Sequence, residues 1–219
     1  MKVYFFIVLI LVSKAVDAQV SVKDEPNHAV VFENQYVRIL DVRLKPGDTT
    51  LYHMHQTPSV FLCYSKTRMG NQEQGKEQTQ SESQKGSAWY RSFAKTVQIH
   101  RVWNRDSVPF HTVDIEILAS KTGIAVKRIE KANLELIADE ERVRIYKIEL
   151  LPKSIFQLKS NPTQFILSPV EGKIEVSILR GRKNKLKGGE CLWIDRNQSF
   201  KVTNISNIKV FGYLFEIKP

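Results

Sequence analysis

Three histidines have the side chains and the spacing needed to hold a metal ion. His53 and His55 follow Gly47 after five other residues and are separated by one, and His100 comes later in the chain. Alternate side chains of a β-strand share a face, so His53 and His55 are expected to point into one cavity. Imidazole nitrogens suit borderline divalent ions. The pattern predicts a metal site at His53, His55 and His100.

A histidine on a strand is more simply a polar surface residue or a satisfied core residue, and this alternative holds for each of the three alone. Three at this spacing favour a common site. His28 and His111 lie outside the pattern, and we expect them to be ordinary residues. The sequence shows no Ser-His-Asp order, phosphate-binding glycine loop or dinucleotide fingerprint.

The segments that must position these histidines are short and apolar, with Gly, Asn, Asp and Pro between them. Residues 173–178 alternate apolar and polar side chains, which is typical of a half-buried strand. The segment 131–142 is the one stretch that could form a helix. The pattern predicts an all-β protein.

An internal repeat divides the chain. Residues 37–39 and 143–145 both read Val-Arg-Ile, and each is followed at the same distance by a proline, which sets an offset of 106. Residues 100–104 align with 200–204 at an offset of 100. The repeat predicts two copies of one β unit.

Gly47-x5-His53-x-His55 and His100-x3-Asn104 together resemble the two motifs of the cupin superfamily. The resemblance covers both copies. It implies two cupin domains (double-stranded β-helix, or jelly-roll) in tandem, a bicupin, with His53, His55 and His100 as metal ligands. The domains are expected at 19–125, with the metal site, and at 126–219, a degenerate cupin.

The sequence departs from the family where a glutamate ligand is expected, because Ser59 and Val60 stand there. Iron, manganese, nickel and zinc therefore all remain candidates. Without the carboxylate, a bound cation keeps more charge and favours an anionic ligand, such as a small molecule with a carboxylate. We see no clear acid or base beside the metal. Tyr52 and Tyr64 lie near the motif, and Tyr52 is expected to point away from His53.

The second copy is expected to bind no metal. At the offsets of the repeat, the three histidine positions become Lys159, Asn161 and Phe200. An ammonium group has no lone pair to offer, and a phenyl ring is no ligand. We expect this copy to pack against the first. Asn104 persists as Asn204, so it is predicted to fix a strand end.

Residues 1–18 are expected to be a signal peptide, with Lys2, an apolar run over 3–12 and small residues before a cleavage site after Ala18. Ten apolar residues are too few to span a bilayer, which takes about twenty. The protein is thus expected to be exported, periplasmic or secreted, with no stable membrane insertion after cleavage. A retained membrane anchor is the alternative.

The formal charge of +10 does not predict a nucleic-acid partner, because basic and acidic residues are neighbours along the chain. A small molecule is the expected partner, and a homo-oligomer is compatible with the sequence. Whether Cys63 and Cys191 pair stays open. Three functions remain: a metal enzyme, a non-catalytic ligand-binding cupin, and a structural bicupin without activity.

Overall fold

The computed structural model describes residues 19–93, 95–120, 126–159, 162–179, 181 and 183–218. The expected signal segment, the expected domain boundary and Asn161 lie outside these residues. Nearly all described elements are strands, which confirms the all-β prediction; the exception is a 3-10 turn, η1 (Val22–Asp24). No helix in these ranges is long and apolar enough to cross a membrane.

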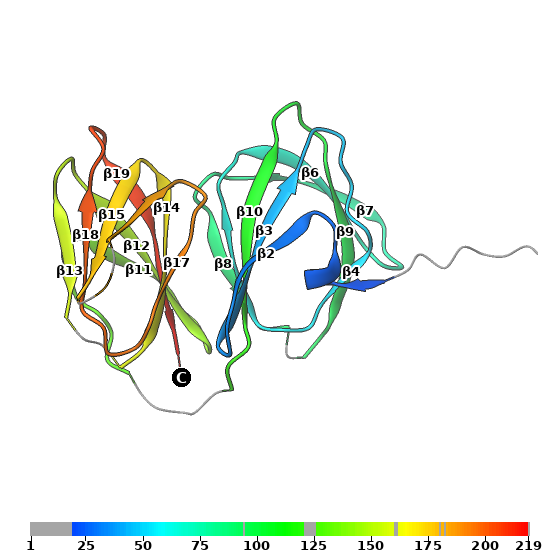
Figure 1. Ribbon diagram of the computed structural model, residues 1–219. Coiled ribbons are helices and arrows are strands. Elements are labelled where there is room, and N and C mark those ends of the chain that lie inside the picture. The colour runs from blue at the N-terminus through cyan, green and yellow to red at the C-terminus, as the bar shows by residue number, and fades with distance from the viewer. Residues whose placement is uncertain are drawn as a thin grey trace, which may run out of the picture.

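The first half of the chain forms two five-stranded sheets that curve around one interior (Figure 1). One sheet has the order β1 (Val20–Ser21), β4 (His53–His55), β9 (Gln98–Asn104), β6 (Thr67–Glu73) and β7 (Gln78–Ser83). The other has the order β2 (His28–Glu33), β3 (Val37–Leu44), β10 (Phe110–Ile117), β5 (Ser59–Cys63) and β8 (Ala88–Arg91). Apolar side chains from both sheets, among them Leu40, Met69 and Phe110, close part of the interior.

The second half repeats this arrangement. Its five-stranded sheet has the order β11 (Leu134–Asp139), β12 (Val143–Leu150), β19 (Val210–Ile217), β14 (Gln164–Glu171) and β17 (Leu192–Ile194). Its four-stranded sheet has the order β13 (Ile155–Leu158), β18 (Phe200–Asn204), β15 (Lys173–Ile178) and β16 (Lys183–Lys187). The helix considered for 131–142 is wrong: β11 occupies it, with alternate residues half-buried as a strand requires.

Asn104 and Asn204 occupy equivalent places in the two copies and make equivalent hydrogen bonds. Asn104 donates from Nδ2 to the carbonyl oxygens of Leu44 (3.0 Å) and Val108 (2.8 Å). Asn204 makes the same two bonds in the second half. The side chain thus joins a strand end to the following turn in each copy, as the sequence predicted for this residue.

One extra residue precedes the first histidine. Thr49 lies opposite Trp103, and His53 lies opposite His100, so four steps on one strand face three on the other. Such a bulge shifts every later residue by one position. The corresponding strands of the second half, β13 and β18, pair without a shift.

This bulge corrects the repeat alignment by one residue at His53 and at the positions that follow it on the strand. Leu158 lies opposite Phe200 in the second half, as His53 lies opposite His100 in the first. The counterpart of His53 is therefore Leu158, and the assignment to Lys159 was wrong by one residue. Leu158 is buried, so the position is even less suited to a metal than a lysine would be.

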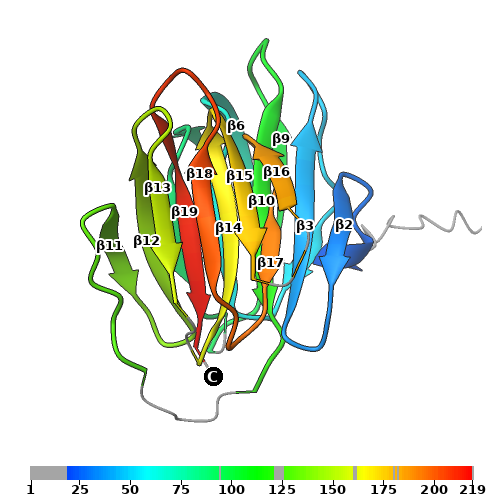
Figure 2. The same ribbon diagram turned by 60° about the vertical axis from the view of Figure 1, so that its left-hand side comes forward.

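The two halves share a core. The outer faces of the β2-β3-β10-β5-β8 and β11-β12-β19-β14-β17 sheets pack against each other, and Figure 2 shows the second half in front of the first. The Tyr64 and Ser168 hydroxyls meet across this interface at 2.6 Å. The buried apolar members include Val37, Ile39, Val60, Leu62 and Ile115 from the first half, and Val143, Ile145, Ile166, Phe215 and Ile217 from the second.

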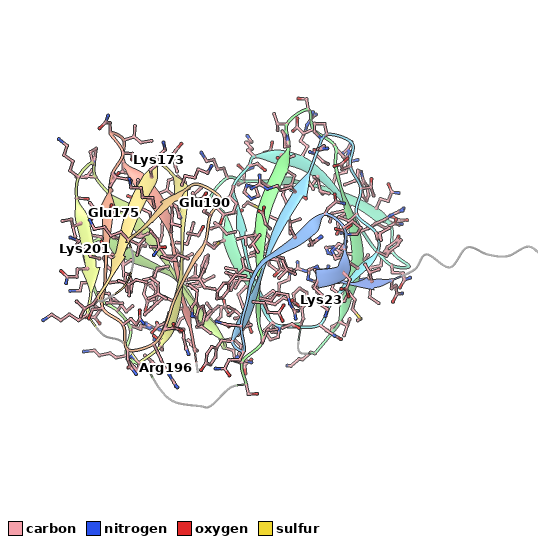
Figure 3. All side chains as sticks on the ribbon, viewed as in Figure 1. Lys23, Lys173, Glu175, Glu190, Arg196 and Lys201 are labelled. Atoms are coloured by element: carbon pink, nitrogen blue, oxygen red, sulfur yellow. The ribbon has the colours of Figure 1, made fainter. Side chains whose placement is uncertain are left out.

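The sheet of the second half that faces away from this interface is solvated. Figure 3 shows Lys173, Glu175 and Lys201 there, on the side turned away from the first half. Glu175 pairs with Lys183 at 3.1 Å.

Cys63 and Cys191 are both free, which answers the question of their pairing.

Candidate metal centre

Strands β4 and β9 bring the three predicted histidines together. His53 and His55 lie on one face of β4, and His100 lies opposite His53 on β9. One ligand nitrogen from each lies within 4.8 Å of the other two, and the described residues hold no other such group of histidine, cysteine or carboxylate ligands. Strand geometry thus accounts for the shared face of His53 and His55, and the pairing of β4 with β9 adds His100 to the cluster.

Hydrogen bonds fix the orientation of two of the rings. His53 Nδ1 lies 2.9 Å from the carbonyl oxygen of Leu51, and His100 Nδ1 lies 2.7 Å from Oδ1 of Asn71. A carbonyl oxygen only accepts, so Nδ1 carries the proton in both rings. Each Nε2 is then left with a lone pair for a metal ion, which is how metal-binding histidines are commonly held.

The distance between two of the ligand atoms matches a shared ion. His55 Nε2 lies 3.2 Å from His100 Nε2. Two nitrogens that each lie about 2.1 Å from one ion stand roughly 3.0 to 3.4 Å apart, depending on the coordination angle. The His100 nitrogen has no proton to donate, so either a proton on His55 Nε2 or a cation between the rings can satisfy this pair. The donor set therefore fits a borderline divalent metal.

Burial keeps two of these imidazoles neutral. It lowers the pKa of His53 to about 3, and the nearby His28 and His55 rings add to the shift. It also lowers the pKa of His100 to about 2, with further contributions from His53 and His55. A neutral imidazole is the form that binds metal, so neither ring has to lose a proton first.

These shifts predict that the metal-free protein loses stability as the pH falls from about 6.5 towards 3. In that window the unfolded chain binds protons on these histidines, with an ordinary pKa of about 6.5, while the folded chain does not. Replacing His100 by phenylalanine, the residue found at Phe200, is expected to make this dependence shallower. Melting temperatures of chelator-treated protein at several pH values measure it. An equally steep loss in the His100→Phe variant would contradict this cause.

The histidines open into a cavity of about 550 Å³ inside the first barrel. Many other polar or charged side chains also line it, among them the five residues His28, Asn71, Glu73, Arg91 and Asp114.

The same positions in the second barrel are apolar. The strand pairings place Leu134, Val176, Ile178, Ile194 and Leu214 at the counterparts of these five residues. All five belong to or pack against the apolar core that fills the second barrel. These five polar side chains are thus a property of the histidine-bearing copy and not a requirement of the fold.

Unlike the five cavity residues, one Arg–Glu ion pair is present in both copies. Arg38 contacts Glu116 at 2.6 Å, and Arg144 contacts Glu216 at 3.2 Å at the equivalent place. Because the pair persists where the cavity does not, we assign it to the fold. The comparison of copies thus separates structural polar residues from those of the cavity.

His28 also lines the cavity, which its place outside the motif did not indicate. Its Nδ1 contacts Oε2 of the buried Glu25 at 2.5 Å, and its ring lies 4.8 Å from the His53 ring. The repeat could have indicated this role of His28, because the residue at offset 106 is the apolar Leu134. His111 lies outside the cavity and contacts Asp41 at 2.6 Å, as expected of an ordinary residue.

The family's glutamate position holds no ligand. The Ser59 hydroxyl donates to the carbonyl oxygen of Thr57, and Val60 packs in the interface between the halves. An acid nevertheless stands beside the histidines, which the sequence did not reveal. Oδ2 of Asp114 lies 3.4 Å from Nδ1 of His55.

The architecture matches solved structures closely enough to assign the fold. A cupin 2 conserved barrel domain protein from Leptotrichia buccalis aligns with a TM-score of 0.56 and 10% identity, over 90% of this chain and 98% of that one. An oxalate decarboxylase from Lactobacillus farciminis, in a formate complex, aligns with a TM-score of 0.61 and 10% identity, over 88% and 80%. This chain has a bicupin fold. The cupin resemblance and the tandem jelly-roll prediction are confirmed at the level of fold.

The bicupin fold alone does not decide the function. Procruciferin, an 11S globulin from Brassica napus, also aligns with the chain, with a TM-score of 0.59 and 10% identity over 83% and 76% of the two chains. The solved structures that align with this chain thus include an oxalate decarboxylase and a globulin, so function must be argued from the site. No family model and no curated protein matches the sequence.

Proposed function

We propose that this bicupin binds one divalent transition metal through His53, His55 and His100, and that it holds a small carboxylate-bearing molecule in the cavity beside the ion. The observation that carries the proposal is the convergence of three imidazoles in a polar cavity whose counterpart in the second barrel is filled by apolar side chains. Iron, manganese, nickel and zinc all suit the donor set.

A divalent ion held by these neutral imidazoles would keep its charge, and it would supply a site that binds and polarises an anionic oxygen. The chain offers a second group for such a ligand. Arg91 lines the cavity and also a neighbouring surface groove of about 590 Å³, so it stands where the two meet. It donates from Nη1 to Oε1 of Gln98 at 3.0 Å.

Arg91 has no carboxylate partner within 4.0 Å in the described part of the chain, and its counterpart Ile194 is buried. A guanidinium group matches the geometry of a carboxylate and can bind both of its oxygens. We therefore propose that Arg91 binds the anionic end of the ligand at the cavity entrance.

The Arg91→Gln variant is expected to bind small carboxylates at least about tenfold more weakly, because a charge-assisted hydrogen bond contributes about 1.5 to 3 kcal/mol. Titration of the metal-loaded protein with acetate and malonate, followed by calorimetry, measures this affinity. Arg105→Gln, at an exposed position outside the cavity, is the matched control. Equal affinities in the two variants would contradict the role of Arg91. Analysis of the recovered carboxylate distinguishes an enzyme from a protein that only holds its ligand.

We also propose that the chain is exported, periplasmic or secreted, after removal of residues 1–18. Lys2, the apolar run and the small residues before Gln19 support this. The intact mass of the protein from its native cell is expected to correspond to a chain that begins at or near Gln19. A mass that includes Met1 to Ala18 would contradict the proposal.

A further inference from the structure

Asp114 is a buried acid without a hydrogen-bond partner. It lies in the middle of β10, between Val113 and Ile115, which face the interface with the second half. Its own side chain faces the cavity and is 1% exposed. Neither carboxylate oxygen has a hydrogen-bond partner, and neither does Nδ1 of His55, 3.4 Å from Oδ2.

A carboxylate in this state costs stability, because burial removes its water and nothing replaces it. The same strand shows how the fold treats a buried acid that is paired. Glu116, two residues on, contacts Arg38, and the second copy keeps this pair as Glu216 and Arg144. The unpaired acid is different, because its counterpart is the fully buried Leu214. The acid is therefore found only beside the histidines.

The rings of the site explain why an acid is useful at this place. Nδ1 of His53 faces the oxygen of Leu51, and Nδ1 of His100 faces that of Asn71. Asp114 is the group in the corresponding place for His55. Carboxylate oxygens that accept from the far nitrogen of a metal-bound imidazole fix its tautomer and make it a better ligand.

The position of Asp114 also relates to the missing glutamate. Ser59, where the family's glutamate is expected, lies on β5 opposite Glu116, and Asp114 lies opposite Phe61 on the same pair of strands. Ser59, Phe61 and Asp114 all face away from the interface. The acid thus comes from β10, the strand next to β5. It lies opposite Phe61, which is the next inward-facing residue of β5 after Ser59.

We propose that Asp114 is the carboxylate of this metal site, acting as a positioning residue for His55 in place of the glutamate absent at Ser59. It would accept a hydrogen bond from Nδ1–H of His55, leave Nε2 free for a bound ion and reduce the net charge around that ion by one. The remaining positive charge still favours an anionic ligand. This inference rests on the proposed metal site.

The test compares the chelator-treated mature protein with its Asp114→Asn and Asp114→Leu variants. Titration with Co²⁺, followed by visible absorption and calorimetry, is expected to show at least about tenfold weaker binding in both variants, the loss typical of groups that orient a metal ligand. Without metal, the Asp114→Leu variant is expected to melt at a higher temperature than the wild type, because an unpartnered buried acid has been removed.

Glu116→Gln is the matched control on the same face of the same strand. It is expected to lower the melting temperature, because Arg38 loses its partner, and to change the Co²⁺ affinity less than about threefold. Wild-type affinity in Asp114→Asn would overturn the role of Asp114 and leave the metal site standing. A parallel loss of affinity and melting temperature in both Asp114 variants would show a structural role instead. Absence of Co²⁺ binding in the wild type would overturn both proposals.

Discussion

Replacing His53 and His55 together by alanine is expected to reduce the bound divalent metal from one ion per chain to none, while the β structure is retained. Two of three ligands are then absent, and a single imidazole does not hold a labile divalent ion against water. The fold is expected to survive because the second copy has Leu158 and Phe200 at two of the histidine positions and still forms its barrel. Elemental analysis gives the metal content, and circular dichroism follows the fold.

The matched control for this variant is His111→Ala. His111 contacts Asp41 and the Tyr64 ring near the interface and does not line the cavity. The His111→Ala variant is therefore expected to keep its bound metal. A full complement of metal in the double variant, or equal loss in the control, would contradict the assignment of the ligands.

A chain that ends near residue 120, without the second half, is expected to aggregate or to bind metal more weakly than the full protein. Its β2-β3-β10-β5-β8 sheet would expose to water the apolar side chains that now pack in the shared core. Solubility, melting and metal affinity of the shortened chain measure the effect. The full chain, in turn, is expected to unfold in a single transition.

Two point variants test the same interface in the full chain. Phe215→Ala removes a fully buried side chain from the shared core and is expected to cost about 3 to 5 kcal/mol. Ile155→Ala, on the exposed face of β13, is the control and is expected to cost far less. Two well-separated unfolding transitions, or a soluble first half with undiminished metal affinity, would show that the second half is an independent appendage.

The parts of the structure that were predictable rest on local patterns. His53 and His55 share a face because of strand geometry alone, and the resemblance of His100-x3-Asn104 to the second cupin motif joined His100 to them. The offset of 106 failed at Lys159 because a one-residue bulge leaves no mark in composition. The segment 131–142 was ambiguous because a strand as short as β11 has too few residues for its periodicity to be distinguished from that of a helix.

The remaining cavity residues were missed because their convergence depends on which strands pair. His28, Arg91 and Asp114 lie on β2, β8 and β10, which are far apart in sequence and are neighbours of the site only in the folded barrel. None belongs to a motif. Comparison of the two copies, residue by residue along the paired strands, would have singled out all three, because each is apolar in the second barrel.

The metal-to-protein ratio of the full-length mature protein, purified without chelators and measured by elemental analysis, tests the central claim most directly. A ratio near one is expected, because the first barrel holds the three imidazoles and the second barrel is filled by apolar side chains. A ratio near two would contradict the claim that the second copy is empty. A ratio near zero that divalent metal does not restore would contradict the metal site itself.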